Sequence, residues 1–169
     1  MENEVGNELA AGANVDSIKN AGFFGENEAP LRLSLAYTGG TFDLFHMGHV
    51  RLLQWCKALA KEVVVSLNTD EFIFEYKKKL PVIGYEERRE VLLSCKYVDQ
   101  VIPNIGGADS KVAITSVRPD VIVIGSDWAS KNYYTQMGFS HDWLDEQGIG
   151  LCYVPYTKGI SSSQIRKSL

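Results

Sequence analysis

Residues 31–67 read LRLSLAYTGGTFDLFHMGHVRLLQWCKALAKEVVVSL, and this stretch decides the fold. Large apolar residues occupy every second position from residue 31 to residue 37, which is the period of a β-strand. Between residues 49 and 61 the apolar residues gather on one face of a helix. Residues 63–67 form a short, β-branched run typical of a buried strand. This order predicts two parallel strands joined by a right-handed helical crossover.

The rest of the chain repeats this alternation of helical patterns and short apolar runs. Such repeated units bury a parallel sheet between two layers of helices. The sequence therefore predicts an α/β fold, a Rossmann-like doubly wound parallel sheet of about five strands in a single domain. We expect helices at 85–96, from Asp109 or Ser110 through 117, at 141–147 and from Ser161–Ser163 onward, and strands at 98–102, 121–124 and 151–156.

The first 30 residues differ in character from the rest. Residues 1–30 contain six acidic residues, several glycines and asparagines, and no sustained hydrophobic period. A segment of this composition cannot bury enough apolar surface to order itself. We interpret residues 1–30 as a flexible or loosely docked N-terminal extension and residues 31–169 as the folded domain.

Composition excludes several classes of protein. The chain has 169 residues, a net charge of −4 and 45% hydrophobic residues, which is ordinary for a globular protein. It lacks a basic stripe for nucleic acid, an apolar run of the roughly 18–20 residues that span a membrane, and a secretory signal. Its three cysteines are far apart in sequence and have apolar neighbours. We expect reduced thiols and a cytoplasmic protein without nucleic-acid or membrane partners.

Two of the three histidines, His46 and His49, lie where the first strand passes through a glycine turn into a helix. Helix N-termini bind phosphate through free N–H groups, and two imidazoles there suggest chemistry on phosphate. Zinc is the rival interpretation, but no acidic or cysteine partner stands nearby at ligand spacing. A purely structural histidine pair is the third. The glycines fit neither the dinucleotide pattern nor the Walker pattern.

Other polar loops are predicted at the same edge of the sheet. Residues 68–70, 125–128 and 157–163 each follow a predicted strand. The carboxyl ends of parallel strands meet at one edge, where open α/β sheets bind their ligands. The convergence of these loops with the histidine turn predicts a single site.

The motifs resemble those of a known family. Residues 41–49, TFDLFHMGH, resemble the His-x-Gly-His signature of the cytidylyltransferase branch of the nucleotidyltransferase superfamily. Residues 159–166, GISSSQIR, are similar to its second signature. Residues 96–102, KYVDQVI, and the segments TDEF at 69–72 and GSDW at 125–128 match smaller blocks of the family. Together these matches identify the chain as a member of this branch.

Within the branch, the size and motifs are most similar to those of glycerol-3-phosphate cytidylyltransferases. The resemblance implies that a phosphate oxygen of an acceptor attacks the α-phosphorus of CTP and expels pyrophosphate. The acceptor phosphate is a dianion near neutral pH, with a second pKa of about 6, so no strong base is needed. The enzyme must supply alignment and charge neutralisation. The catalytic residues implied are His46, His49, Lys78 and Arg166, with Lys77 as the alternative to Lys78.

The resemblance also assigns binding roles. Mg²⁺ is expected to arrive with the nucleotide, with no residue assigned as its ligand, and the family commonly forms homodimers. Asp43 orients either a neighbouring side chain or the metal, and the sequence leaves both open. The acceptor-binding residues implied are Asp70, Arg88 and Lys77. The nucleotide-binding residues implied are Thr38, Gly39, Gly40, Thr41, Phe42, Asp43, Gly48, Asp127, Trp128, Thr157, Ile160, Ser161, Ser162 and Ser163.

Two departures from the family pattern leave the acceptor open. Tyr156 stands where relatives often have an arginine, and Lys96 replaces an arginine whose bidentate geometry lysine lacks. Glycerol 3-phosphate, phosphoethanolamine and other small phosphorylated alcohols all remain candidates. The alternatives to CTP transfer are an adenylyltransferase similar to FAD synthetases and a nucleotide-binding module without turnover.

Overall fold

The computed structural model describes residues 32–129 and 133–168, so the predicted N-terminal extension lies outside the described residues. A five-stranded sheet has the order β3-β2-β1-β4-β5, and every adjacent pair of strands is parallel. Its strands are β1 (Leu33–Gly40), β2 (Ala60–Leu67), β3 (Gln100–Pro103), β4 (Val121–Gly125) and β5 (Gly150–Val154). The predicted Rossmann-like doubly wound fold is thus confirmed.

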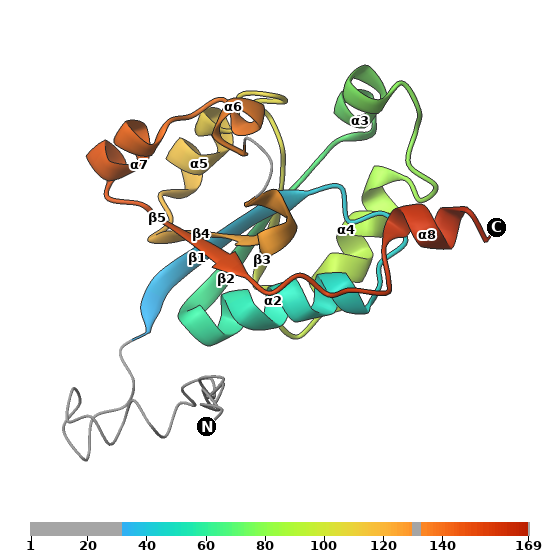
Figure 1. Ribbon diagram of the computed structural model, residues 1–169, viewed down its shortest axis with the longest axis horizontal. Helices are drawn as coiled ribbons and strands as arrows, with labels where there is room; N and C mark the ends of the chain where they lie inside the picture. Colours follow the sequence, from blue (N-terminus) through green and yellow to red (C-terminus); the bar gives the residue numbers. More distant parts are fainter. Residues whose placement is uncertain (1–31, 130–132, 169) are drawn as a thin grey trace, which may run out of the picture. The chain divides into compact units, whose positions relative to one another are not determined.

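Helices cover both faces of the sheet (Figure 1). Helices α2 and α4 lie on one face, and α5, α6 and α7 lie on the other. None of the helices in the described ranges is long and apolar enough to cross a bilayer. The helices are α2 (Met47–Leu59), α3 (Asp70–Lys77), α4 (Tyr85–Ser94), α5 (Lys111–Val117), α6 (Tyr133–Met137), α7 (His141–Gln147) and α8 (Ser162–Arg166), with a 3₁₀ turn η1 (Ser126–Trp128).

Each face has its own buried core. Leu53 of α2 and Leu92 of α4 pack with Val65 of β2 on one face. Ile114 of α5 packs with Ile122 of β4 on the other. Strands buried on both faces are apolar along their whole length, which explains the continuous runs at 63–65 and 121–124.

The first glycine pair does not form the predicted turn. Gly39 and Gly40 continue β1, in register with Ser66 and Leu67 of β2, so the strand extends three residues beyond the predicted end at Tyr37. Pairing with β2 satisfies the backbone groups of these glycines, and the turn begins only after them. The phosphate-binding loop is therefore attached directly to a central strand.

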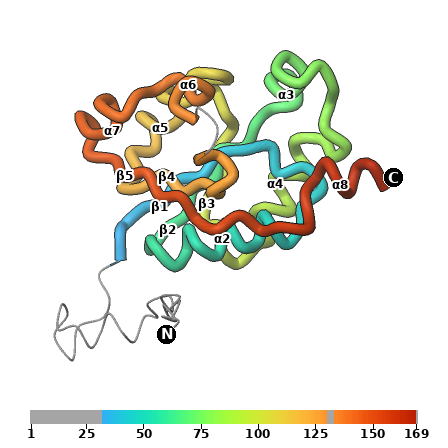
Figure 2. The backbone as a smooth tube through the Cα atoms, in the orientation of Figure 1, coloured from blue at the N-terminus to red at the C-terminus, as the bar shows by residue number. Residues whose placement is uncertain are grey.

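The segment between β5 and α8 runs beside α2. Figure 2 shows the last segment running from β5 along α2 toward α8. A Cβ built on Gly48, in the first turn of α2, would lie 3.8 Å from Cβ of Thr157. This path brings the second sequence signature against the first, although more than 100 residues separate them.

Candidate active site

A cavity of about 560 Å³ opens at the carboxyl edge of the sheet. It is lined by the ends of β1, β2 and β4 and by the loops that follow β3 and β5. The predicted residues that line it are Thr38, Gly39, Gly40, Thr41, Phe42, Asp43, His46, Gly48, His49, Lys77, Asp127, Trp128, Thr157, Ser161, Ser162, Ser163 and Arg166. Ile160, Lys78, Asp70 and Arg88 do not line it.

The two histidines cap α2 with their own rings. Nδ1 of His46 accepts a hydrogen bond from the backbone N–H of Gly48 at 3.1 Å, and Nδ1 of His49 accepts one from His46 at 3.4 Å. A ring nitrogen that accepts carries no proton, so each neutral imidazole holds its proton on Nε2. The rings stack with centroids 3.9 Å apart. The pair therefore presents two Nε2–H donors rather than two bases.

Glycine is required between these histidines. A Cβ on Gly48 would lie 2.8 Å from Cε1 and 3.0 Å from Nδ1 of His46. Any larger residue would push the ring away from the first turn of α2. The ring of His46 can accept from the helix and still face the cavity only because residue 48 has no side chain.

Burial keeps the pair uncharged near neutral pH. Burial lowers the pKa of His46. Burial, followed by the neighbouring His46, lowers the pKa of His49 to about 3, against a smaller opposing effect of Asp43. The apolar neighbours are Phe42 and Phe45, whose ring centroids lie 5.1 and 5.6 Å from that of His49. The histidines thus act on a phosphate as neutral hydrogen-bond donors.

The low pKa of His49 predicts a pH-dependent stability. Below pH 6.5 the unfolded chain binds a proton at this position that the folded protein does not, so stability falls as pH falls. Between pH 7 and pH 5 the loss due to His49 should be about 2 kcal/mol in the free energy of unfolding. Urea titrations at both pH values should show that the free energy of unfolding of His49→Asn falls by about 2 kcal/mol less than that of the wild type. Equal losses would mean that His49 is not held neutral.

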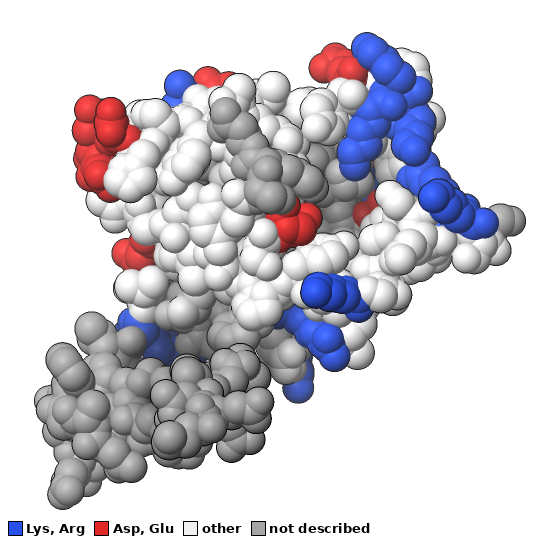
Figure 3. Space-filling model, viewed as in Figure 1, with Lys and Arg blue, Asp and Glu red and all other residues white. Residues whose placement is uncertain are grey.

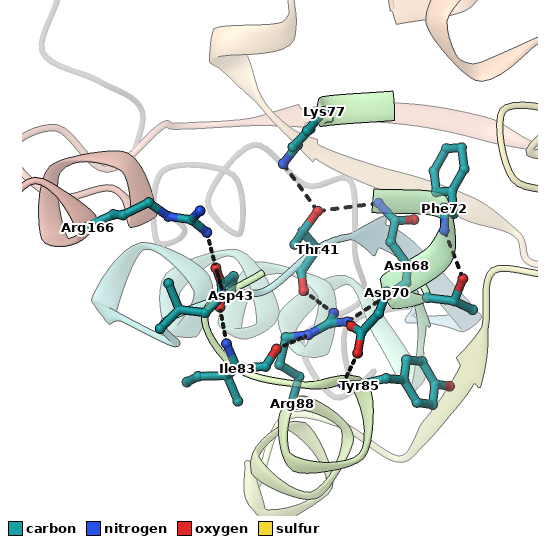
Figure 4. Close-up of polar contacts among 12 residues, drawn as sticks. Thr41, Asp43, Asn68, Asp70, Phe72, Lys77, Ile83, Tyr85, Arg88 and Arg166 are labelled. Atoms are coloured by element: carbon teal, nitrogen blue, oxygen red, sulfur yellow. Dashed lines mark hydrogen bonds and ion pairs between the residues drawn. The ribbon is translucent and has the colours of Figure 1, made fainter. Parts of the chain in front are cut away.

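Asp43 links the turn between β1 and α2 to the loop after α3 and to α8 through hydrogen bonds and an ion pair. Its carboxylate accepts hydrogen bonds from the backbone N–H groups of Val82 at 2.9 Å and Ile83 at 3.0 Å, and pairs with Arg166 at 2.5 Å (Figure 4). Burial raises the pKa of Asp43, but these hydrogen bonds and the Arg166 charge outweigh it and hold the pKa below its usual value. The flanking Phe42 and Leu44 have φ of 51° and 50°, a strained backbone that such contacts stabilise.

These contacts bear on the two roles left open for Asp43. Both carboxylate oxygens are engaged by donors from the protein itself. No group of three or more His, Cys, Asp or Glu residues that could hold a metal ion occurs within residues 32–129 and 133–168. The arrangement favours Asp43 as a residue that orients Arg166 and the loop after α3.

Helix α8 meets the histidines through a serine. Oγ of Ser162 donates to the backbone oxygen of Asp43 at 2.6 Å and lies 3.4 Å from Nε2 of His46. Because Nε2 carries the proton, His46 is the donor in this long contact, and a phosphate oxygen in the cavity would take the place of Ser162 as its acceptor. The two sequence signatures therefore share one hydrogen-bond network at the cavity.

Residues 77–79 are three consecutive lysines, and the first candidate among them for a catalytic role, Lys78, is the one that does not line the cavity. Lys78 ends α3 in the left-handed conformation, with φ of 55°, and does not line the cavity. Lys77 and Lys79 do, and Nζ of Lys77 lies 3.4 Å from Oγ1 of Thr41. Burial, and then the nearby Arg166, lower the pKa of Lys77. Lys79 was missed by the sequence reasoning, although the triple-lysine run was its signal.

Positive charge gathers on this side of the molecule. Figure 3 shows Lys and Arg side chains clustered over α3 and α8, with acidic side chains beside them at α3 and others elsewhere on the same face. Lys77 of α3, Lys79 in the loop after it and Arg166 of α8 line the cavity. Cations gathered on one side of a cavity favour the binding of a polyanion such as a triphosphate, and one of them, Arg166, is also paired with Asp43.

Arg88 is buried and donates hydrogen bonds to several loops. Its guanidinium donates to the backbone oxygens of Thr41 at 2.6 Å and Asn68 at 3.0 Å, and to the carboxylate of Asp70 at 2.6 Å (Figure 4). Its Nε donates to the backbone oxygen of Ile83 at 2.9 Å, and the side chain is fully buried. Acceptor binding by Arg88 and Asp70 stays a prediction, and it would require both side chains to leave these partners.

Sequence comparison supports the resemblance inferred from the motifs. Residues 37–168 match the family model described as Cytidylyltransferase-like. The chain is 38% identical to glycerol-3-phosphate cytidylyltransferase of Bacillus subtilis (strain 168) over 132 residues, covering 78% of this chain and 94% of that protein. It is 38% identical to FAD synthase of Pyrococcus abyssi over 89 residues, covering 53% of this chain and 60% of the relative.

Solved structures support the fold. A lipopolysaccharide core biosynthesis protein from Thermoplasma volcanium is similar with a TM-score of 0.60 and 26% identity, over 76% of this chain and 99% of that one. A pantothenate synthetase from Thermus thermophilus matches with a TM-score of 0.54 and 14% identity, over 81% of this chain and 65% of that one. At such identity the second match shows the fold alone.

Proposed function

This chain belongs to the cytidylyltransferase-like family and is a nucleotidyltransferase, and we propose that it joins CTP to a small phosphorylated alcohol, with glycerol 3-phosphate as the first candidate. The observation that carries the proposal is the pair of neutral Nε2–H donors of His46 and His49, facing one cavity with Lys77, Lys79 and Arg166. Such a set neutralises charge on transferring phosphates without providing a nucleophile or a strong base.

The reaction needs alignment more than proton transfer. An oxygen of the acceptor phosphate forms a bond to the α-phosphorus of CTP as the bond to the bridging oxygen of the β-phosphate breaks, and pyrophosphate leaves with the electron pair. The acceptor enters as a dianion, so no protein group must remove a proton. The histidine N–H donors and the cations would stabilise charge on the α-phosphate and on the departing oxygen.

Mg²⁺ would be held chiefly by the nucleotide. Asp43 is engaged by three protein donors. A Mg²⁺ ion commonly binds through substrate phosphates with few protein ligands, so the described residues fit a metal that enters with CTP. There it would supply further neutralisation of triphosphate charge.

The order of the strands divides the cavity. β1 is central and carries the phosphate-binding turn, with β4 on one side and β2 and β3 on the other. We place the nucleoside on the β4 side, beside Asp127 and Trp128. The acceptor then enters on the side formed by the ends of β2 and β3, near Lys77. Both phosphates would meet at the turn between them.

Pyrophosphate release tests the function. Protein mixed with CTP, Mg²⁺ and glycerol 3-phosphate should release pyrophosphate, and ATP in place of CTP should give a much lower rate. CTP at 100 times its dissociation constant should stabilise the fold by about 2.7 kcal/mol, seen as a rise in Tm. Turnover with ATP and FMN instead would favour the FAD synthase-like alternative. CTP binding without turnover on any phosphorylated alcohol would favour a binding module.

A further inference from the structure

Two amide side chains on the acceptor side of the cavity have a fixed orientation. Nδ2 of Asn104 donates to the backbone oxygen of Gly107 and to Oδ1 of Asn68, each at 2.9 Å. A backbone carbonyl only accepts hydrogen bonds, so the atom of Asn104 that contacts Gly107 must be the nitrogen. This fixes the amide of Asn104, which in turn fixes that of Asn68.

The same chain of contacts reaches the phosphate-binding turn. Nδ2 of Asn68 and Nζ of Lys77 each lie 3.4 Å from Oγ1 of Thr41 (Figure 4). Both groups donate, so they occupy the two lone pairs of the hydroxyl oxygen. The hydroxyl hydrogen of Thr41 must point elsewhere, and Thr41 lines the cavity. Thr41 is thereby set to donate to an incoming phosphate.

One oxygen in this network that could accept a hydrogen bond has no donor in the part of the chain that the structure describes. Oδ1 of Asn104 is buried and has no hydrogen-bond partner among the described residues, although Asn104 lines the cavity. A buried oxygen without a donor is unfavourable, and a ligand hydroxyl that donates to it after a small shift of the Asn104 side chain removes that cost. The loop that carries it includes Gly107 in a left-handed conformation, with φ of 57°, packed against Phe72.

The charges on this side oppose a cationic acceptor. Asp70 follows β2, but its carboxylate pairs with Arg88 and accepts from the backbone N–H of Tyr85, and it does not line the cavity. Of the described lining residues contributed by the ends of β2 and β3, by α3 and by the loops after α3 and β3, the charged ones are Lys77 and Lys79. Asp43 acts on Lys77 from the neighbouring turn, but its carboxylate is already engaged by two backbone N–H groups and Arg166. An ammonium group would thus meet cations and neutral amides without a free carboxylate partner.

We propose that Asn104 and Asn68 are specificity-determining residues that bind the hydroxyl groups of the acceptor, so that the enzyme selects a neutral polyol phosphate over an amino-alcohol phosphate. The inference rests on the proposed function. Asn104 accepts from the alcohol portion through Oδ1, and Asn68 aligns Thr41 on the phosphate. Selection has two sources. Oδ1 of Asn104 can accept a hydrogen bond from a substrate hydroxyl, and the cavity wall offers an ammonium group no counter-charge.

The test is the ratio of kcat/KM for glycerol 3-phosphate to kcat/KM for phosphoethanolamine, both with CTP. This ratio does not depend on how much of a variant is folded. The wild type should favour glycerol 3-phosphate by at least about tenfold, and Asn104→Asp should lower the ratio by at least about tenfold, because it places a carboxylate beside the acceptor. Asn104→Leu should raise KM for glycerol 3-phosphate while KM for CTP stays unchanged.

Gln54→Glu is the matched control, because it adds the same charge on the outer face of α2, where Gln54 contacts Tyr97. It should keep the wild-type ratio. A wild-type ratio near one or below, or an unchanged ratio in Asn104→Asp, would overturn the inference and leave cytidylyl transfer standing. No pyrophosphate from CTP with either acceptor or with other polyol phosphates would overturn the proposed function and the inference with it.

Discussion

His46→Asn should bind CTP with nearly wild-type affinity and lose about 10²- to 10³-fold in kcat, the usual effect of removing one donor to a developing charge. Asparagine is a good helix N-cap, so its side chain can replace Nδ1 of His46 as the acceptor for the N–H of Gly48. It has no counterpart to the Nε2–H that faces the cavity. Pyrophosphate release measures kcat, and calorimetry measures the dissociation constant of CTP.

His141→Asn is the control for this prediction. His141 is exposed at the start of α7, where it pairs with Asp145, and it does not line the cavity. The His141→Asn variant should have the kcat of the wild type. His46→Asn could instead weaken CTP binding by the same factor as it lowers kcat/KM. The ring would then contribute equally to binding the ground state and the transition state, and its catalytic role would be rejected.

Arg88→Met should lower the free energy of unfolding by about 3–5 kcal/mol, because it removes a fully buried guanidinium that bonds three backbone oxygens and the carboxylate of Asp70. The substitution keeps much of the apolar volume and removes four hydrogen bonds. It leaves the carboxylate of Asp70 without its cation. For a protein of this size the fall in Tm should be about 10 °C or more. Urea titration and thermal unfolding measure both quantities.

Arg51→Met provides the matched control, since Arg51 is exposed on α2 and the substitution makes the same change in charge. Its stability should stay within about 0.5 kcal/mol of the wild type. A stable Arg88→Met protein with a raised KM for the acceptor alone would contradict the prediction. That result would restore the acceptor-binding role that the sequence resemblance implies.

The sequence predicted the strands better than the helices between them. Residues 63–65 and 121–124 are buried on both faces, so their apolar runs are continuous and easily recognised. Helix α3 was not predicted, because Ile73 is its one buried residue and the apolar stripe of a helix is missing. The last predicted strand ended two residues late, because residues after Val154 leave the sheet to line the cavity.

At the site, residues whose role depends on nearby sequence could be predicted, and residues whose role depends on distant segments could not. The spacing of the histidines and the glycine between them are local properties of one helix turn, so the motif could be read from sequence, and His46, Gly48 and His49 all line the cavity. The choice among Lys77, Lys78 and Lys79 depends on where α3 ends, and Lys78 is the residue that turns away in the left-handed conformation. Asn104 carried no motif, since its importance arises from Gly107 and Asn68.

By itself, the sequence determined the doubly wound parallel sheet, the edge at which its loops converge and the family, because hydrophobic period and motif spacing are local and linear. The tertiary structure alone decided how side chains from distant segments are used. Asp43 contacts Arg166, 123 positions away, and Arg88 reaches Thr41 across 47. Whether a charged group faces a ligand or a partner within the protein depends on burial and on donors brought together only by folding.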